Sequence, residues 1–145
     1  MKTVLIIKGP NFNMLGKRES QFYGSQTLEN LTKDLQEAGA GFDMKVEVRQ
    51  SNAESEIIEW VHDAMEKYDG LIINAAAYTH TSVAIHDALK MLDIPVIEVH
   101  MSNPHAREDF RKTSFISPLA KGIIAGFGAE SYTLALQALN TILAE

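Results

Sequence analysis

The feature of this sequence that most constrains its fold is a regular alternation of two hydrophobic periodicities. Five short apolar runs have the length and the Val and Ile content of buried strands, at residues 4–7, 46–48, 71–73, 95–99 and 123–125. Between most of them lie apolar stripes at the spacing of amphipathic helices, over residues 28–38, 57–65, 83–91 and 132–143. Strands that alternate with helices predict a parallel sheet covered on both faces.

The same alternation predicts the class and the domain organisation of the chain. We expect an α/β protein with one domain over residues 1–145, built as an open, doubly wound, five-stranded parallel sheet of the flavodoxin-like type, in the order 2-1-3-4-5. Ligands of such sheets bind beyond the carboxyl ends of the strands, near the switch in strand order. The residues that follow the first, third and fourth strands are therefore the candidate site residues.

The composition excludes several classes of protein. A chain with 46% hydrophobic and 22% charged residues is globular, and its net charge of −6 disfavours nucleic-acid binding by charge alone. No apolar run approaches the ~18 residues of a membrane span, and the run that follows Lys2-Thr3 is too short for a secretory signal. The absence of cysteine excludes disulfides and thiol nucleophiles and suits a reducing compartment. We expect a cytoplasmic protein without membrane or nucleic-acid partners.

The connection after the first strand is long. It runs from Gly9 to Gly24 (GPNFNMLGKRESQFYG), and the next helix is expected to begin near Thr27. Connections of this kind usually have about 2–6 residues, and much longer ones tend to be binding loops or lids. Its position at the ligand edge favours a functional loop, and a solvated surface loop is the alternative.

Polar residues also close the third and fourth strands. Asn74 ends the third strand, where a structural and a binding role are equally open, and the hydroxyls of residues 79–82 are interpreted as helix caps. Glu98 and His100 lie two residues apart, hence on one face of the fourth strand. A carboxylate beside an imidazole fixes its tautomer and favours its protonated form, which predicts a general acid, with a structural ion pair as the alternative.

The segment after the fourth strand is polar and basic. Ser102 and the backbone N–H groups around it are suited to hold a carboxylate. Arg107 and Arg111 are four residues apart, and we interpret Arg107 as part of a charged, solvated helix. No Rossmann fingerprint, P-loop or nucleophile elbow occurs, and the histidines lack metal-ligand spacing, so we expect no metal site.

Several segments together resemble the signatures of type II 3-dehydroquinate dehydratase. They are GPNFNMLG at residues 9–16, residues 18–24, Asn74 with His80-Thr81-Ser82, EVHMSN at residues 98–103, and REDFR at residues 107–111. Their order and spacing cover nearly the whole chain. The resemblance implies a flavodoxin-like fold and a homododecamer built as a tetramer of trimers. It also implies anti elimination of water from 3-dehydroquinate to 3-dehydroshikimate through an enolate, in the shikimate pathway, with no metal or organic cofactor.

The resemblance further implies a role for each matching residue. Tyr23 removes the proton next to the ketone, Arg18 lowers the pKa of Tyr23, and Asn11 helps hold the enolate through a water. His100, oriented by Glu98, protonates the departing hydroxyl. The substrate is bound by Asn74, His80, Met101, Ser102 and Arg111, and by Asp87, which reaches the site of a neighbouring subunit.

The chain departs from the family pattern at a few positions. Lys8 stands where the family usually has Asn, and Phe12 where Leu is common. Ala75-Ala76 replaces the more usual Pro-Gly or Ala-Gly, so a positive φ at position 76 is expected to cost on the order of 1 kcal/mol.

Two other functions fit the same fold. A flavin-binding electron carrier calls for a phosphate loop rich in Ser and Thr after the first strand, where this chain has Gly9-Pro10-Asn11. A phospho-accepting receiver needs acidic residues at the end of that strand, where Lys8 and Gly9 stand. Within the dehydratase assignment, both aromatic biosynthesis and quinate breakdown remain open.

Overall fold

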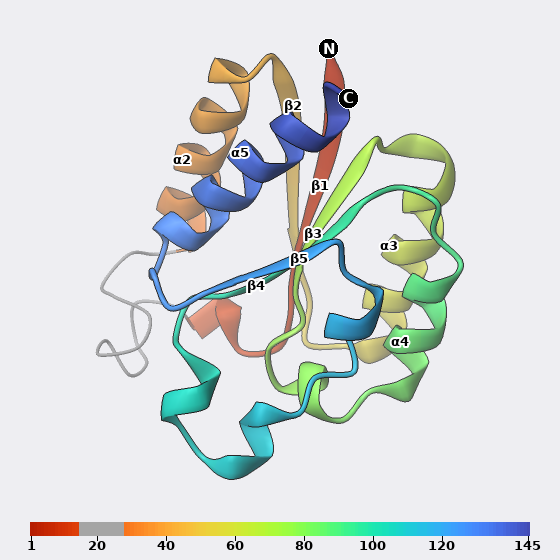
Figure 1. Cartoon of the computed structure of the whole chain (residues 1–145), viewed down its shortest axis with the longest axis vertical. Coiled ribbons are helices and arrows are strands. Elements are labelled where there is room, and N and C mark those ends of the chain that lie inside the picture. The colour runs from red at the N-terminus through yellow and green to blue at the C-terminus, as the bar shows by residue number, and fades with distance from the viewer. Residues whose placement is uncertain (15–27) are drawn as a thin grey trace.

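The fold is built around one five-stranded parallel sheet (Figure 1). The computed structural model describes residues 1–14 and 28–145. The strands are β1 (Lys2–Lys8), β2 (Met44–Gln50), β3 (Gly70–Asn74), β4 (Val96–His100) and β5 (Gly122–Ala125). Their order is β2-β1-β3-β4-β5, and each neighbouring pair is parallel, as the sequence predicted. The switch in strand order lies between β1 and β3.

Two pairs of helices cover the two faces of the sheet. α2 (Leu28–Gly41) and α5 (Glu130–Leu143) cover one face, and α3 (Glu54–Lys67) and α4 (Val83–Lys90) cover the other (Figure 1). The central strand β1 shows why both faces need cover. Val4 and Ile6 are buried in the core under α2 and α5, whereas Leu5 and Ile7 are buried in the core under α3 and α4. Consecutive apolar residues are the pattern of a strand buried on both sides.

The irregular connections are concentrated at the carboxyl end of the sheet. They contain short 3₁₀ helices, named η1 (Phe12–Met14), η2 (Ala76–His80), η3 (Pro104–Ala106), η4 (Asp109–Lys112) and η5 (Ser117–Leu119). Both chain termini lie at the opposite end (Figure 1). Among the residues described, no helix has the length and apolar character needed to cross a membrane.

Local chemistry fixes the start of α4. The Ser82 hydroxyl oxygen accepts a hydrogen bond from the Ile85 N–H at 2.9 Å and so caps the helix, as the sequence predicted for the hydroxyls of this stretch. The cap expected at Thr27 lies outside the described residues.

Two small residues shape the approach of the β1 and β3 ends. A Cβ at Gly9 would lie 2.5 Å from the Ala75 carbonyl oxygen, so only glycine lets these two connections meet. Ala76 has a φ of +52°, the left-handed region that disfavours a residue with a Cβ. The positive φ considered from the sequence is therefore present, and it falls on an alanine.

Candidate active site

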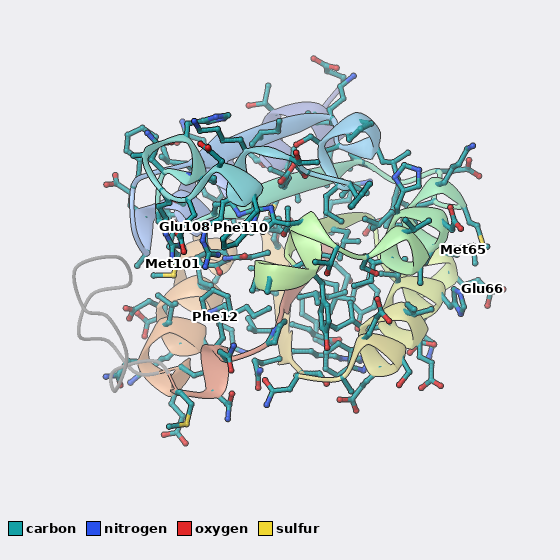
Figure 2. All side chains as sticks on the ribbon, turned by 90° about the horizontal axis from the view of Figure 1, so that it is seen from below. Phe12, Met65, Glu66, Met101, Glu108 and Phe110 are labelled. Carbon is teal, nitrogen blue, oxygen red and sulfur yellow. The ribbon has the colours of Figure 1, made fainter. Side chains whose placement is uncertain are left out.

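A cavity of about 100 Å³ opens at the carboxyl ends of β1, β3 and β4. This is the edge where a doubly wound sheet is expected to bind ligands. Figure 2 looks at this end of the molecule, where Phe12, Met101 and Phe110 lie toward one side and Met65 lies at the opposite edge. Seven of the residues expected from the sequence line this cavity: Asn11, Asn74, His80, His100, Met101, Ser102 and Arg111.

The most tightly held group in this wall is the pair at the end of β4. Glu98 and His100 are 2% and 8% exposed, and His100 Nε2 lies 2.5 Å from Glu98 Oε2. Since Nε2 faces the carboxylate, Nδ1 is the ring nitrogen left for the cavity side. Burial alone would raise the pKa of Glu98, but hydrogen bonds from His100, Ser117 and Ser114 outweigh it and hold that pKa below its ordinary value. Glu98 is therefore an ionised carboxylate that orients His100.

A second histidine, His80, is hydrogen-bonded through Nδ1, whereas His100 is hydrogen-bonded through Nε2. His80 Nδ1 lies 2.7 Å from the Thr113 carbonyl oxygen, which only accepts, so Nδ1 carries the hydrogen. Burial lowers the pKa of His80, and the positive charge of His100 and Arg111 adds to that lowering. His80 is therefore neutral near pH 7, and its Nε2 is a hydrogen-bond acceptor.

Amide side chains complete the β1 and β3 side of the cavity. Asn74 is 3% exposed, and its Nδ2 donates to the Tyr132 hydroxyl at 2.9 Å while its Oδ1 accepts from the Ala76 N–H at 3.1 Å. Asn11 has a φ of +74°, and its N–H donates to Asn52 Oδ1 at 2.8 Å. Asparagine tolerates this conformation better than most residues. The side-chain amide of Asn74 and the backbone of Asn11 are therefore each held by hydrogen bonds within the chain.

Two arginines make the remaining wall cationic, and one of them corrects the sequence interpretation. Arg107 was expected in a solvated helix, but its side chain is only 9% exposed and its Nη1 donates to Ser102 Oγ at 3.1 Å. Arg111 Nε donates to Glu108 Oε1 at 2.9 Å from the short helix η4. The irregular backbone between η3 and η4 turns Arg107 inward, which a helical pattern does not predict. A cavity with two guanidinium groups suits a small anion.

Four of the expected site residues are not among the described residues that line this cavity. Tyr23 and Arg18 lie outside the described residues. Asp87 is exposed on α4 and does not line the cavity of its own chain. Glu98 instead lines a smaller cavity of about 70 Å³, which His80, His100 and Arg111 also line.

Comparison with known proteins agrees with this architecture. The sequence profile of the family described as Dehydroquinase class II matches residues 2–140. The chain belongs to the class II dehydroquinase family. The 3-dehydroquinate dehydratase of Rhizobium johnstonii is 52% identical over 143 residues, which cover 99% of both chains. The 3-dehydroquinate dehydratase 1 of Agrobacterium fabrum is 51% identical over 141 residues, which cover 97% of both chains.

Solved structures show the same relationship. The type II dehydroquinase of Propionibacterium acnes superposes with a TM-score of 0.94 at 44% identity, covering 97% of each chain. A 3-dehydroquinate dehydratase-like protein of Bifidobacterium longum superposes over the full length of both chains with a TM-score of 0.78 at 34% identity. The flavodoxin-like fold predicted from the sequence is therefore confirmed. The alternative of a flavin-binding electron carrier has no support.

Within the dehydroquinase fold, Lys8 is the residue whose surroundings are least expected. It is fully buried at the end of β1, and its Nζ lies 4.7 Å from the centroid of the Tyr132 ring. This Nζ has no hydrogen-bond partner among the described residues. Burial lowers the pKa of Lys8 from 10.5 to about 7. A lone lysine after four apolar residues gives no sequence signal for such burial.

Proposed function

We propose that this chain is a 3-dehydroquinate dehydratase, which eliminates water from 3-dehydroquinate to give 3-dehydroshikimate. The observation that carries this function is the buried Glu98–His100 pair in a cationic cavity at the switch edge, in a chain of the class II dehydroquinase family. An elimination next to a ketone needs a base at one carbon and an acid at the leaving oxygen. The acid and the substrate-binding groups are among the described residues, and the family resemblance assigns the base to Tyr23.

His100 acts as the general acid. The C–O bond of the substrate breaks, the hydroxyl takes the proton from His100 Nδ1, and water leaves. Glu98 holds Nε2–H at 2.5 Å, so Nδ1 is the nitrogen that delivers the proton. The ionised carboxylate of Glu98 faces the ring and orients it for the transfer.

Tyr23 acts as the base in this proposal. It removes a proton from the carbon next to the ketone, and the electron pair is held as an enolate that then forms the new C=C bond. A free tyrosine has a pKa of about 10 and is a poor base at neutral pH. A guanidinium nearby can lower that value by about 1–3 units, which is the role proposed for Arg18. Asn11 at the cavity wall supports the enolate through a bound water.

The substrate is held by groups that match its carboxylate and hydroxyls. Ser102 and the backbone of Met101 bind the carboxylate, and Arg107 supports Ser102 through its hydrogen bond of 3.1 Å. Asn74, His80 and Arg111 bind the hydroxyls and neighbouring groups. The neutral Nε2 of His80 accepts from a substrate hydroxyl, and Asn74 Nδ2 retains a second hydrogen for donation.

The proposed chemistry is proton transfer by the chain's own residues, without a metal or organic cofactor. Among the described residues, no group of three or more His, Asp or Glu side chains is arranged to hold a metal. Chelators should therefore leave turnover unchanged. Borohydride added with substrate should also leave turnover unchanged, because no lysine Schiff base forms. Irreversible loss of activity with a lysine adduct would contradict this mechanism.

The active form is proposed to be a homododecamer, a tetramer of trimers. Asp87 is exposed and away from its own cavity, which fits a residue that serves the site of a neighbouring subunit. An apolar patch is also exposed on the edge strand β5 and beside it, where Ile123 is 54% and Phe127 is 61% exposed. Light scattering should give an oligomer. A fully active monomer would contradict both the assembly and the role of Asp87.

We place the enzyme in the cytoplasm and in the shikimate pathway. The cysteine-free sequence suits a reducing compartment, and the product is an intermediate of aromatic biosynthesis in that pathway.

The function is tested by incubating the purified protein with 3-dehydroquinate. The product has a C=C bond conjugated with the ketone, so ultraviolet absorbance should rise with time and with enzyme concentration. The His100→Ala variant serves as the matched control for contaminating activity. Wild-type protein that leaves 3-dehydroquinate unchanged would overturn the proposed function.

A further inference from the structure

One irregular segment contacts His80 directly and also contacts Glu98, the partner of His100. We call residues 113–117, the connection from η4 to η5 together with the first residue of η5, the clasp segment. Ile116 is fully buried in the core under α3 and α4. The Phe115 N–H donates to the Thr79 carbonyl at 2.9 Å, and the Phe115 carbonyl accepts from His86 Nδ1 at 2.7 Å. The clasp segment is thereby tied to η2 and to α4.

The first contact of the clasp segment fixes His80. The Thr113 carbonyl oxygen accepts from His80 Nδ1 at 2.7 Å. A carbonyl cannot donate, so the tautomer with hydrogen on Nδ1 is selected and Nε2 keeps its lone pair. The His80 ring stacks against His100 with centroids 6.5 Å apart and planes inclined by 17°. Two positive rings at this separation would repel each other, which also favours a neutral His80.

The second set of contacts fixes Glu98. Ser114 Oγ donates to Glu98 Oε2 at 2.9 Å, and Ser117 Oγ makes a short hydrogen bond to Oε1. His100 Nε2 donates to Oε2 as well. Both carboxylate oxygens therefore accept hydrogen bonds, and an acceptor with this many donors is held in the ionised form. The result at His100 is Nε2–H toward Glu98 and Nδ1 toward the cavity.

From this geometry we propose that the clasp segment is a positioning element that gives the two stacked histidines opposite roles. Through Thr113 it makes His80 a hydrogen-bond acceptor, and through Ser114 and Ser117 it makes His100 a proton donor. This inference rests on the proposed function and deepens it, because it assigns the protonation pattern of the site to residues outside the substrate cavity. Ser114 and Ser117 line the smaller cavity and not the larger one, and their hydroxyls contact Glu98, so they act through Glu98.

The two serines differ as probes. Ser114 Oγ also accepts the backbone N–H groups of Ile116 and Ser117, at 3.1 and 3.0 Å, so its loss disturbs the clasp segment itself. Ser117 contacts Glu98 through its hydroxyl, and Ser117→Ala is therefore the cleaner change. The titratable and charged groups around Glu98 are His100, His80, His105, Arg111 and Lys112. None of these side chains is altered by the substitution.

The test is the pH profile of kcat, with KM measured at each pH, for Ser117→Ala in the full-length assembled enzyme. Loss of one hydrogen bond to a charged group should lower kcat by about tenfold, while KM changes by less than about twofold. The acid limb should move to higher pH, because a carboxylate that has lost a donor takes up a proton more readily. Ser117→Thr keeps the hydroxyl and should restore most of kcat and the acid limb.

Ser131→Ala is the matched control. Ser131 is fully buried, and its hydroxyl accepts from the Phe127 N–H at 3.1 Å, away from the cavity. This variant should lose some stability and keep the wild-type pH profile. If Ser117→Ala does not fold, Ser117→Cys, a weaker donor of similar size, should show the same shift of the acid limb.

The outcomes distinguish a failure of the positioning role of the clasp segment from a failure of the proposed function. A folded Ser117→Ala enzyme with wild-type kcat and an unmoved acid limb would overturn the positioning role, as would the same shift in Ser131→Ala. Either result leaves the dehydratase function standing. A wild-type chain with no activity on 3-dehydroquinate would instead remove the proposed function itself.

Discussion

The carboxyl ends of β4 and β1 reach the same cavity but bury charge in opposite ways. At the end of β4, Glu98 is 2% exposed and accepts hydrogen bonds from His100, Ser114 and Ser117. At the end of β1, Lys8 is fully buried, and its Nζ lies 4.7 Å from the centroid of the Tyr132 ring without a hydrogen-bond partner among the described residues. Glu98 keeps its negative charge because both carboxylate oxygens accept hydrogen bonds, whereas Lys8 loses its proton near neutral pH.

The β4 end is therefore arranged for proton transfer, whereas the burial of Lys8 at the β1 end lowers the stability of the fold. The β4 end holds Glu98 and His100, the residues to which the resemblance assigns protonation of the leaving hydroxyl. The β1 and β3 ends carry Lys8, which is fully buried, and Ala76, which has a φ of +52°. We therefore expect substitutions at the β4 end to change turnover and substitutions at Lys8 and Ala76 to change mainly stability.

The largest expected effect is at the acid. His100→Ala should lower kcat by about 10²–10⁴, the range for a lost proton-transfer group, with the fold intact. Glu98→Gln should lower kcat less, because the acid remains but loses its orienting charge. Steady-state kinetics with circular dichroism on each variant checks both expectations. Near-normal turnover in His100→Ala would mean that another group protonates the leaving hydroxyl.

A comparable loss is expected on the base side, in the long connection that follows β1. Tyr23→Phe should lower kcat by about 10²–10⁴. Arg18→Ala should also be severely slowed, because the pKa of Tyr23 would return toward about 10. Since the two residues act as one unit, the double variant should fall far short of additivity in activation free energy. Strict additivity of the two single effects would show that they do not form the base together.

The next largest effect is expected on the free energy of unfolding, through the buried Lys8. Between about pH 7 and pH 10.5 the unfolded chain holds a proton on Lys8 that the folded chain has released. The free energy of unfolding should therefore rise with pH across this window, and below it the full cost of burying the charge is present. Lys8→Met should raise stability near pH 7 by about 2–4 kcal/mol, with a gain that shrinks toward pH 10.5.

Urea unfolding at several pH values measures this gain. Lys45→Met on the neighbouring strand is the matched control, because the Lys45 side chain is 65% exposed and should change stability by less than about 0.5 kcal/mol. A Lys8→Met protein that is less stable than wild type at pH 7 would show that the amine is paired in the folded chain.

The smallest expected effect is at Ala76. Glycine adopts a φ of +52° without the clash of a Cβ, so Ala76→Gly should raise stability by about 0.5–1 kcal/mol. Ala77→Gly is the control, because Ala77 lies in the same short helix without a positive φ and should lose stability on substitution. Equal losses at both positions, measured by urea unfolding, would contradict the strain assigned to Ala76.

Most of the fold and much of the site follow from sequence periodicity. The strand order and the grouping of Asn74, Glu98 and His100 at one sheet edge depend on the βα alternation alone, because parallel strands end at the same edge. What pattern reasoning missed depends on irregular backbone and on long-range contacts. The inward turn of Arg107 has no periodic signal, and Ser117 reaches Glu98 from 19 residues away through a 3₁₀ connection.

The central claim is that His100 acts after the enolate has formed, and proton exchange tests it most directly. In D₂O, the His100→Ala enzyme should still remove and return the proton next to the ketone, because the base is untouched. Recovered 3-dehydroquinate should then gain one deuterium, seen by mass spectrometry, while formation of 3-dehydroshikimate is about 10²–10⁴ slower than in wild type. Loss of exchange in proportion to the loss of product would contradict this order of steps and the role of His100 as the acid.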